Sequence, residues 1–470
     1  MEHHESAEMA LFFRTHGNQS ILTFLPEHAN RPFSAIFLFL GYHLSNGEFW
    51  GGWLIFALAS LGQFFVAFWL LKLINIKGFY LHLSLAFVLA SIPLWTDGLF
   101  LRFLTPQITI LLWILWLAFS LRFMQIKGLQ PLNIILMISF ATIAILTYPA
   151  FLALMMGSIL FLIYYNRTIK NTKLLAIAVV IPFVIFISST ILFSSFNTGY
   201  LSDIGISTYF DMLYQIPVLY GDFFLQDSWS ILGYFVIIIS LIIVLVVASL
   251  NKIVTKENLI FTISSIIISL GSILIFLPLI VVPDLFTRFS ITLFPLLWLT
   301  SILLIHSLRN NYSIENKIYK IFAAIVLTFS VVFSIVNYVY LSHHSSKMEK
   351  AFNTAYSVAS VHEDPTIIFT STDRQFNIRN FQWRSNLAHY YLLTGRMNVD
   401  FYFMSSAAIE AIYDDFGLLP IEIIEDGVYV FDRIPLRSGV GWYRWLVSAN
   451  SEFIDFFERN FDATIEGDST

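Results

Sequence analysis

Side chains suited to chemistry are concentrated at the start of the chain. This segment carries the carboxylates of Glu2 and Glu5, the imidazole of His28, and the guanidinium groups of Arg14 and Arg31. A positioned carboxylate or imidazole can take a proton from a reacting hydroxyl group. An arginine offers a planar fork of donors to an anion such as phosphate. We therefore expect this polar segment to form one wall of an active site.

Further polar candidates lie beside long apolar segments. They are Asp97, Arg102, Gln107 and Arg288. Ion-coupled transporters and proton pumps usually carry ionisable groups at mid-membrane depth, whereas the apolar segments here contain essentially no Asp, Glu, Lys or Arg. Polar groups at the ends of apolar segments favour a reaction at a membrane surface. The substrate of such a reaction would be part lipid and part water-soluble.

The composition is that of a membrane protein. Of the 470 residues, 57% are hydrophobic and 12% are charged, whereas a soluble protein carries about 25% charged residues. The net charge of −5 is small, and the sequence has no basic stripe of the kind that nucleic-acid binding requires. Cysteine is absent, which excludes disulfides, thiolate chemistry and Cys-ligated metals. We expect no nucleic-acid partner.

Ten stretches are long and apolar enough to predict membrane-spanning helices, each of which needs about 20 apolar residues. They cover approximately residues 51–71, 79–95, 104–121, 131–147, 150–165, 174–194, 231–250, 259–282, 289–307 and 321–341. Lys and Arg gather in every second connection, as at Lys72, Arg122 and Lys170. Because basic loops stay in the cytoplasm, we place the intervening connections and both ends of the chain outside.

These patterns predict three regions in an all-α polytopic membrane protein with a C-terminal extracytoplasmic α/β domain. Residues 1–50 form an outer-face juxtamembrane segment, residues 51–341 the transmembrane domain, and residues 342–470 the outer domain. In the last region we predict strands over 366–372 and 427–434 and helices over 384–396 and 405–417, from apolar alternation and from Ser and Gly boundaries. We expect a multi-pass protein of the cell (plasma or inner) membrane.

The sequence of residues 1–50 predicts two helices. Glu2–Arg14 has an amphipathic pattern typical of a helix in the membrane interface. A second helix begins near Pro32, a residue that favours the first helical turn, and is too short to span a membrane. An outer N-terminus of this length, with no helix to export it, leads us to expect a further helix before Met1. The alternative is a short tail translocated on its own.

Three segments resemble the GT-C superfamily of glycosyltransferases. NRPFSAIFLFLGYHL (30–44) resembles the helix after the first outer loop, and SIPLWTDGLFLRFLTPQITILLW (91–113) the second outer loop. PDLFTRFSITLFPLLWL (283–299) resembles a late helix of the protein O-mannosyltransferase and aminoarabinose transferase branches. The resemblance lies in the order and spacing of these motifs and covers most of residues 1–341.

The resemblance implies sugar transfer from a polyprenyl-phosphate donor to a glycan, lipid or protein acceptor at the outer face. Glu2 or Glu5 would be the general base, and Arg288 would hold the departing lipid phosphate. Arg31 and Arg102 are further phosphate contacts, Asp97 corresponds to a second acidic residue, and the substrate-binding set is completed by Arg14, His28 and Gln107. The family's acid is most often Asp, whereas here it is Glu beside His3 and His4.

Several alternatives remain open. The protein could be a polymerase or ligase of lipid-linked glycans, or a non-enzymatic flippase or assembly scaffold for them. Glu2 and Glu5 could form a solvated helix face, and Arg102 and Arg288 could be interface anchors. No cofactor is expected. A divalent metal held by His3, His4 and the neighbouring glutamates is the alternative.

Overall fold

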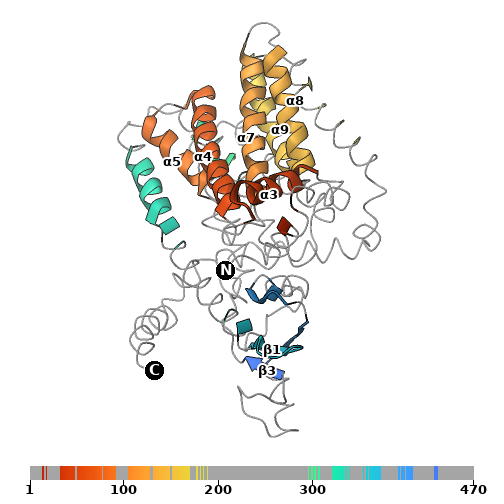
Figure 1. The fold of residues 1–470 in the computed structure, drawn as a ribbon. Helices are drawn as coiled ribbons and strands as arrows, with labels where there is room; N and C mark the ends of the chain where they lie inside the picture. The colour runs from red at the N-terminus through yellow and green to blue at the C-terminus, as the bar shows by residue number, and fades with distance from the viewer. Residues whose placement is uncertain are drawn as a thin grey trace, which may run out of the picture.

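In the residues that the computed structural model describes, the protein is predominantly helical (Figure 1). The described residues are 13–14, 17, 32–47, 50–76, 78–91, 104–126, 131–148, 151–169, 320–332, 359–371, 393–396, 398–405 and 428–431, with single positions within 176–188, 295–306, 334–338, 353–357 and 390–391. The helices are α3 (Pro32–Ser45), α4 (Trp50–Leu73), α5 (Phe79–Ala90), α7 (Leu104–Gln125), α8 (Pro131–Thr147) and α9 (Phe151–Ile169), and the strands are β1 (Thr366–Ser371), β2 (Asp400–Ser405) and β3 (Val428–Phe431).

Two of the described helices have the length and apolarity of membrane-crossing helices. They are α4, with 24 residues, and α7, with 22 residues. The other apolar helices of the described part are shorter, including α8 with 17 residues and Lys320–Val332. The sequence predicted helices in all of these places, and α8 coincides with the predicted range 131–147. Helix α5 covers only part of its predicted range, 79–95, because it ends at Ala90 before the cap residue Ser91.

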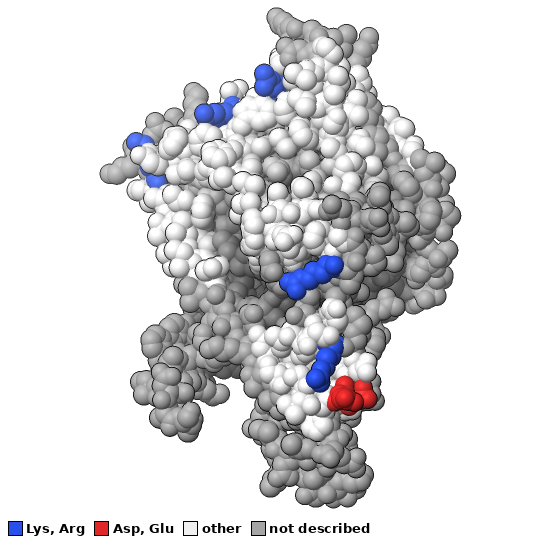
Figure 2. All heavy atoms as spheres, in the orientation of Figure 1, with Lys and Arg blue, Asp and Glu red and all other residues white. Residues whose placement is uncertain are grey.

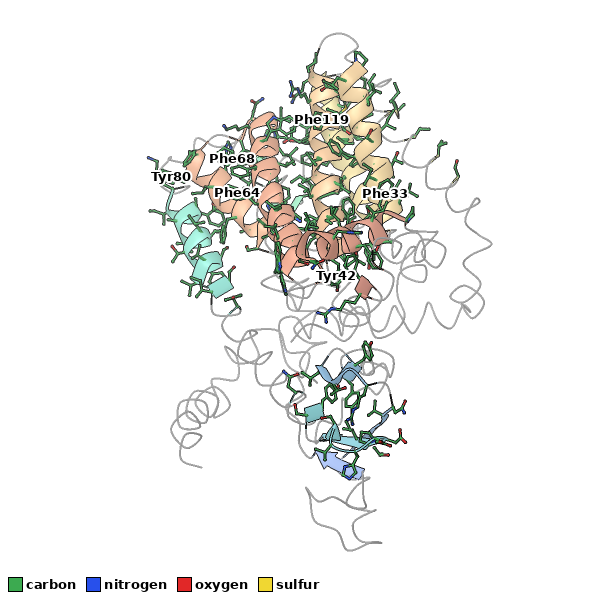
Figure 3. The ribbon with its side chains drawn as sticks, viewed as in Figure 1. Phe33, Tyr42, Phe64, Phe68, Tyr80 and Phe119 are labelled. Atoms are coloured by element: carbon green, nitrogen blue, oxygen red, sulfur yellow. The ribbon has the colours of Figure 1, made fainter. Side chains whose placement is uncertain are left out.

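Helices α4 and α7 run parallel, and three contacts follow one another along both of them. Gln63 hydrogen-bonds Gln107, the rings of Trp69 and Phe119 meet at 5.2 Å, and Gln125 Nε2 donates to the Leu73 carbonyl oxygen at 2.9 Å. Helix α5 returns beside α4 after a tight turn (Figure 3). Ring contacts of Phe68 with Phe79 and His82 close this hairpin.

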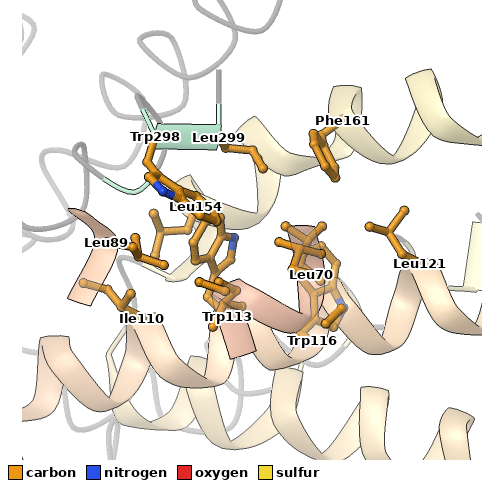
Figure 4. Packing of buried hydrophobic residues seen from close by; sticks show 14 of the residues in the cluster. Leu70, Leu89, Ile110, Trp113, Trp116, Leu121, Leu154, Phe161, Trp298 and Leu299 are labelled. Carbon is orange, nitrogen blue, oxygen red and sulfur yellow. The ribbon is translucent and has the colours of Figure 1, made fainter. Parts of the chain in front are cut away.

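Helix α7 forms the centre of the described core. Its indole side chains Trp113 and Trp116 have no exposed surface. Figure 4 shows Trp113 between side chains of α5, α9 and a late segment that contains Trp298. The indole nitrogen of Trp113 donates to Ser158 Oγ of α9 at 2.8 Å. The buried tryptophans therefore fix α7 against its neighbours by both apolar contact and hydrogen bonding.

A second indole connects distant parts of the chain. Trp298 Nε1 donates to the carbonyl oxygen of Leu85 at 2.7 Å, across a sequence separation of 213 residues. Trp298 and the adjacent Leu299 are buried in the same apolar cluster as α5 and α7. This bond attaches a segment from the second half of the chain to the early helices.

Helix α3 crosses the other helices at one end and meets α4 through glycines (Figure 1). A Cβ atom on Gly41 would lie 2.7 Å from Gly52 Cα, and a Cβ on Gly51 would collide with the carbonyl oxygen of Gly41. The turn between the two helices contains Asn46 and Gly47, both with positive φ. Only glycine permits this closeness of two helix backbones, so α3 is held across the end of α4.

The three strands form a parallel sheet of order β2-β1-β3. Strands β1 and β3 agree with the predicted ranges 366–372 and 427–434, whereas β2 was not predicted. Parallel strands require crossover connections. Helical positions at Tyr390 and Tyr391 fall in the predicted helix 384–396, and the predicted helix 405–417 lies outside the described residues except for Ser405, the last residue of β2.

Candidate functional site

Two of the predicted site residues, Arg14 and Gln107, lie in the described part of the structure. Seven others lie outside the described residues: Glu2, Glu5, His28, Arg31, Asp97, Arg102 and Arg288. The metal alternative at His3 and His4 lies outside them as well. The candidate site is therefore built from Arg14, from Gln107 and from the residues that contact them.

Arg14 is exposed and lies next to the turn that follows α3. Its neighbour Phe13 is buried, stacks on Tyr42 at 6.1 Å between ring centroids and meets the edge of His43 at 4.9 Å. A Cβ atom on Gly47 would lie 3.5 Å from Arg14 Cγ. Phe13 thus anchors this part of the N-terminal segment to the end of α3, and Arg14 brings a positive charge to that surface.

Gln107 lies in the first turn of α7 and has no exposed surface. Gln63 of α4, which is also fully buried, donates from its Nε2 atom to Gln107 Oε1 and to the Gln107 carbonyl oxygen, each at 2.8 Å. Gln63 lies near the middle of α4. The start of α7 therefore packs beside the middle of α4 rather than beside its first turn.

This amide pair has unused hydrogen-bonding capacity. Gln63 Oε1 and Gln107 Nε2 are buried and have no hydrogen-bond partner. Reversing both amides would bring the side-chain oxygen of Gln63 against the Gln107 backbone carbonyl oxygen, where Nε2 now donates at 2.8 Å, and two acceptors in contact repel each other. A buried polar group without a partner costs about 1–3 kcal/mol. The pair thus keeps one acceptor and one donor for a further hydrogen bond.

The surroundings of the pair are apolar and tightly packed. A Cβ atom on Gly62 would lie 3.0 Å from Leu111 Cδ1, so α4 and α7 approach closely next to Gln63. In the first turn of α7, Leu104 and Thr105 are buried together with Gln107. The backbone N–H groups of a first turn have no partner within their own helix. In α7 this applies to the N–H groups of Leu104, Thr105 and Gln107, since Pro106 has no N–H group.

Positive charges mark the opposite end of α4 and α7. Lys72 lies in the last turn of α4 and Arg122 in the last turn of α7, and Figure 2 shows basic side chains at this end of the helices. Lys72 covers the ring of Phe68 at 4.8 Å, and Arg122 that of Trp69 at 5.8 Å. The amide pair lies away from these cations, in a part of the helices that carries no acidic or basic side chain.

Metal binding has no support in the described residues, where no three His, Cys, Asp or Glu side chains come together. Gln107 came from the sequence, whereas Gln63 did not. The signal for Gln63 is a single amide within the 24-residue apolar helix α4. A buried amide in such a helix needs a partner, which in this structure is the other candidate glutamine.

Comparisons with known proteins give no relative for this chain. No protein-family model, curated protein or solved structure matches it.

Proposed function

We propose that this protein is an integral-membrane glycosyltransferase that moves a sugar from a polyprenyl-phosphate donor to an acceptor on the outer face of the membrane. The observation that carries the proposal is the buried pair of Gln63 and Gln107, with one free acceptor and one free donor. Gln107 belongs to the segment 91–113, which resembles the second outer loop of GT-C glycosyltransferases. A residue that the sequence analysis placed in the substrate-binding set thus coincides with unsatisfied polar groups.

The proposed architecture is a multi-pass protein of the cell membrane with ten spans. The candidate membrane helices α4 and α7 support it, as do the cations Lys72 and Arg122 at their common end. By the positive-inside rule this end is cytoplasmic. The opposite ends and the parallel sheet of β1, β2 and β3 then belong to the outer side.

In the proposed reaction, the acceptor hydroxyl attacks the anomeric carbon of the donor sugar while the bond to the lipid phosphate breaks. Glu2 or Glu5 takes the proton of the acceptor. Arg288 binds the departing phosphate, with Arg31 and Arg102 as further cations, since arginine matches phosphate oxygens in geometry. Arg14, which lies exposed beside the turn after α3, is positioned to attract the same anionic lipid.

Transfer is tested with the full chain in lipid nanodiscs and a panel of polyprenyl-phosphate sugars labelled in the sugar. We expect labelled acceptor and free polyprenyl phosphate to appear in equal amounts. The double variant Glu2→Gln/Glu5→Gln should lose about 10²–10⁴-fold in rate, the usual contribution of a general base. Glu363→Gln is the control, because Glu363 is an exposed carboxylate outside the proposed site.

Two results would support the alternatives. Full transfer by a variant that lacks the carboxylates of Glu2, Glu5 and Asp97 would exclude a base in this set and favour a polymerase or ligase of lipid-linked glycans. Movement of labelled donor between the two leaflets without a new glycosidic bond would favour a flippase. Binding of the donor with neither movement nor transfer would favour an assembly scaffold.

A further inference from the structure

Several buried serine and threonine hydroxyl groups in the described helices satisfy their polar atoms within their own helix. Each donates to the backbone carbonyl oxygen four residues earlier in its own helix. Examples are Ser45, Ser84, Thr109, Ser120, Thr147 and Ser158. These side chains have a partner without any ligand. The pair of Gln63 and Gln107 differs, because it joins two helices and still leaves an acceptor and a donor free.

The free atoms of the pair define the chemistry of a complementary group. Gln63 Oε1 accepts a hydrogen bond, and Gln107 Nε2 donates one. A phosphate or carboxylate offers only acceptors and would face an uncompensated carbonyl oxygen. An ammonium group offers only donors and would face the NH₂ group. A hydroxyl group both donates and accepts, and so its chemistry matches both free atoms.

The surroundings favour an uncharged ligand as well. Helices α4 and α7 carry no charged residue near the pair, since their only charged residues are Lys72 and Arg122 in their last turns. Burial of an unpaired charge in such surroundings is costly, whereas a hydroxyl with two hydrogen bonds is not. Gln107 lies in the first turn of α7, so the pair is at the end of that helix opposite to these cations.

We propose that Gln63 and Gln107 form a recognition point for one hydroxyl group of an uncharged sugar carried by a membrane lipid. This inference rests on the proposed function and specifies it. The glutamines bind the sugar, and the arginines bind the phosphate. The pair then determines which lipid-linked sugar is accepted, because a site built to hydrogen-bond a hydroxyl discriminates strongly against a ligand that lacks it.

The test compares two lipids on the full chain in nanodiscs: a polyprenyl-phosphate hexose and the bare polyprenyl phosphate. Gln63→Met and Gln107→Met keep the length of the side chain and remove its amide. We expect each variant to bind the hexose lipid about tenfold more weakly, the effect of about 1.4 kcal/mol, and to bind the bare lipid as the parent does. The control is Gln125→Met, since Gln125 is an exposed amide at the far end of α7.

Thermal unfolding without ligand separates ligand binding from a structural role. The double variant Gln63→Met/Gln107→Met should melt at the same or a higher temperature, because apolar replacement of both partners removes unsatisfied groups. A lower melting temperature together with equal loss of affinity for both lipids would show that the pair only joins α4 and α7. Unchanged affinity for the hexose lipid would show that the pair binds nothing larger than water. Both results overturn the inference.

Failure of this inference and failure of the proposed function give different results. If the parent transfers sugar and Gln63→Met transfers it equally well from every donor, the recognition point is excluded and the glycosyltransferase remains. If the parent binds the hexose lipid through the glutamines but never forms a glycosidic bond, the recognition point remains and the transferase is excluded.

Discussion

Trp113 and Ser158 join α7 to α9 through one hydrogen bond in the core. The indole nitrogen donates to Ser158 Oγ at 2.8 Å, and that hydroxyl donates in turn to the Leu154 carbonyl oxygen at 2.7 Å. Both side chains are fully buried. The hydroxyl of Ser158 is therefore an acceptor for one helix and a donor within its own.

Replacement of Ser158 by alanine should destabilise the protein, because the indole N–H of Trp113 loses its hydrogen-bond acceptor. Ser158→Ala leaves the buried Trp113 N–H without its acceptor, and we expect a loss of about 1–3 kcal/mol. The measurement is unfolding of the detergent-solubilised protein by denaturant. Ser120→Ala is the matched control, because Ser120 is equally buried and donates to the Trp116 carbonyl oxygen of its own helix. Equal losses in both variants would contradict the role of the indole.

The close contact of glycines between α3 and α4 predicts that alanine at Gly51 destabilises the protein more than alanine at another helix glycine. Gly51→Ala places a methyl group against the backbone carbonyl of Gly41, so one helix must shift. We expect a loss of about 1–3 kcal/mol, as for other overpacked cores. Gly62→Ala should cost less, because its methyl group meets only the flexible side chain of Leu111.

Thermal unfolding of the two glycine variants gives the comparison. The prediction fails if Gly62→Ala is the more destabilising of the two.

Positions of the early helices follow from the sequence because length and apolarity decide them. The range 131–147 matches α8, and 51–71 lies within α4, Trp50–Leu73. Strand β2, Asp400–Ser405, was missed. Its run of apolar residues is short, and short apolar runs do not distinguish a strand from a buried helical segment.

The candidate site shows a different limit of sequence reasoning. Gln107 was identified from its place at the end of a predicted membrane helix, but its partner Gln63 is 44 residues earlier. The pairing depends on the register between α4 and α7, which side-chain packing sets. No local pattern in either helix encodes that register. Glu2, Glu5 and Arg288 lie outside the described residues, so their roles stay predictions.

The hydrogen bonds of Arg396 should stabilise the backbone of a short segment before β1. Its Nη1 atom donates to the carbonyl oxygens of Ser360 and His362, at 2.6 and 2.9 Å. Arg396→Ala should raise amide hydrogen exchange across residues 359–364 by about tenfold, because about 1.4 kcal/mol of local stability corresponds to that factor. Arg396→Lys should restore part of the protection through a single cationic donor.

Exchange in α7 gives the internal control for Arg396→Ala. An equal rise in α7 would indicate global destabilisation rather than loss of this contact.

The absence of cysteine makes sidedness directly measurable. Any introduced cysteine is the only thiol in the chain, so a membrane-impermeant maleimide reports one position at a time. We expect Glu363→Cys to react in intact cells and Lys127→Cys to react only after permeabilisation, since the basic connection stays in the cytoplasm. Labelling of Lys127→Cys in intact cells would reverse the proposed orientation.

The hydrogen bond from Trp298 to Leu85 also has a consequence for biosynthesis. The two residues are 213 positions apart, and ribosomes add about 5–20 residues per second. About 10 to 40 seconds therefore pass between the synthesis of Leu85 and that of Trp298. Throughout that interval the carbonyl oxygen of Leu85 lacks the hydrogen bond from Trp298. We expect the membrane-insertion machinery to stay in contact with α5 until the segment that contains Trp298 is inserted. A ribosome that stalls between Leu85 and Trp298 should therefore yield a fragment that proteases degrade rapidly.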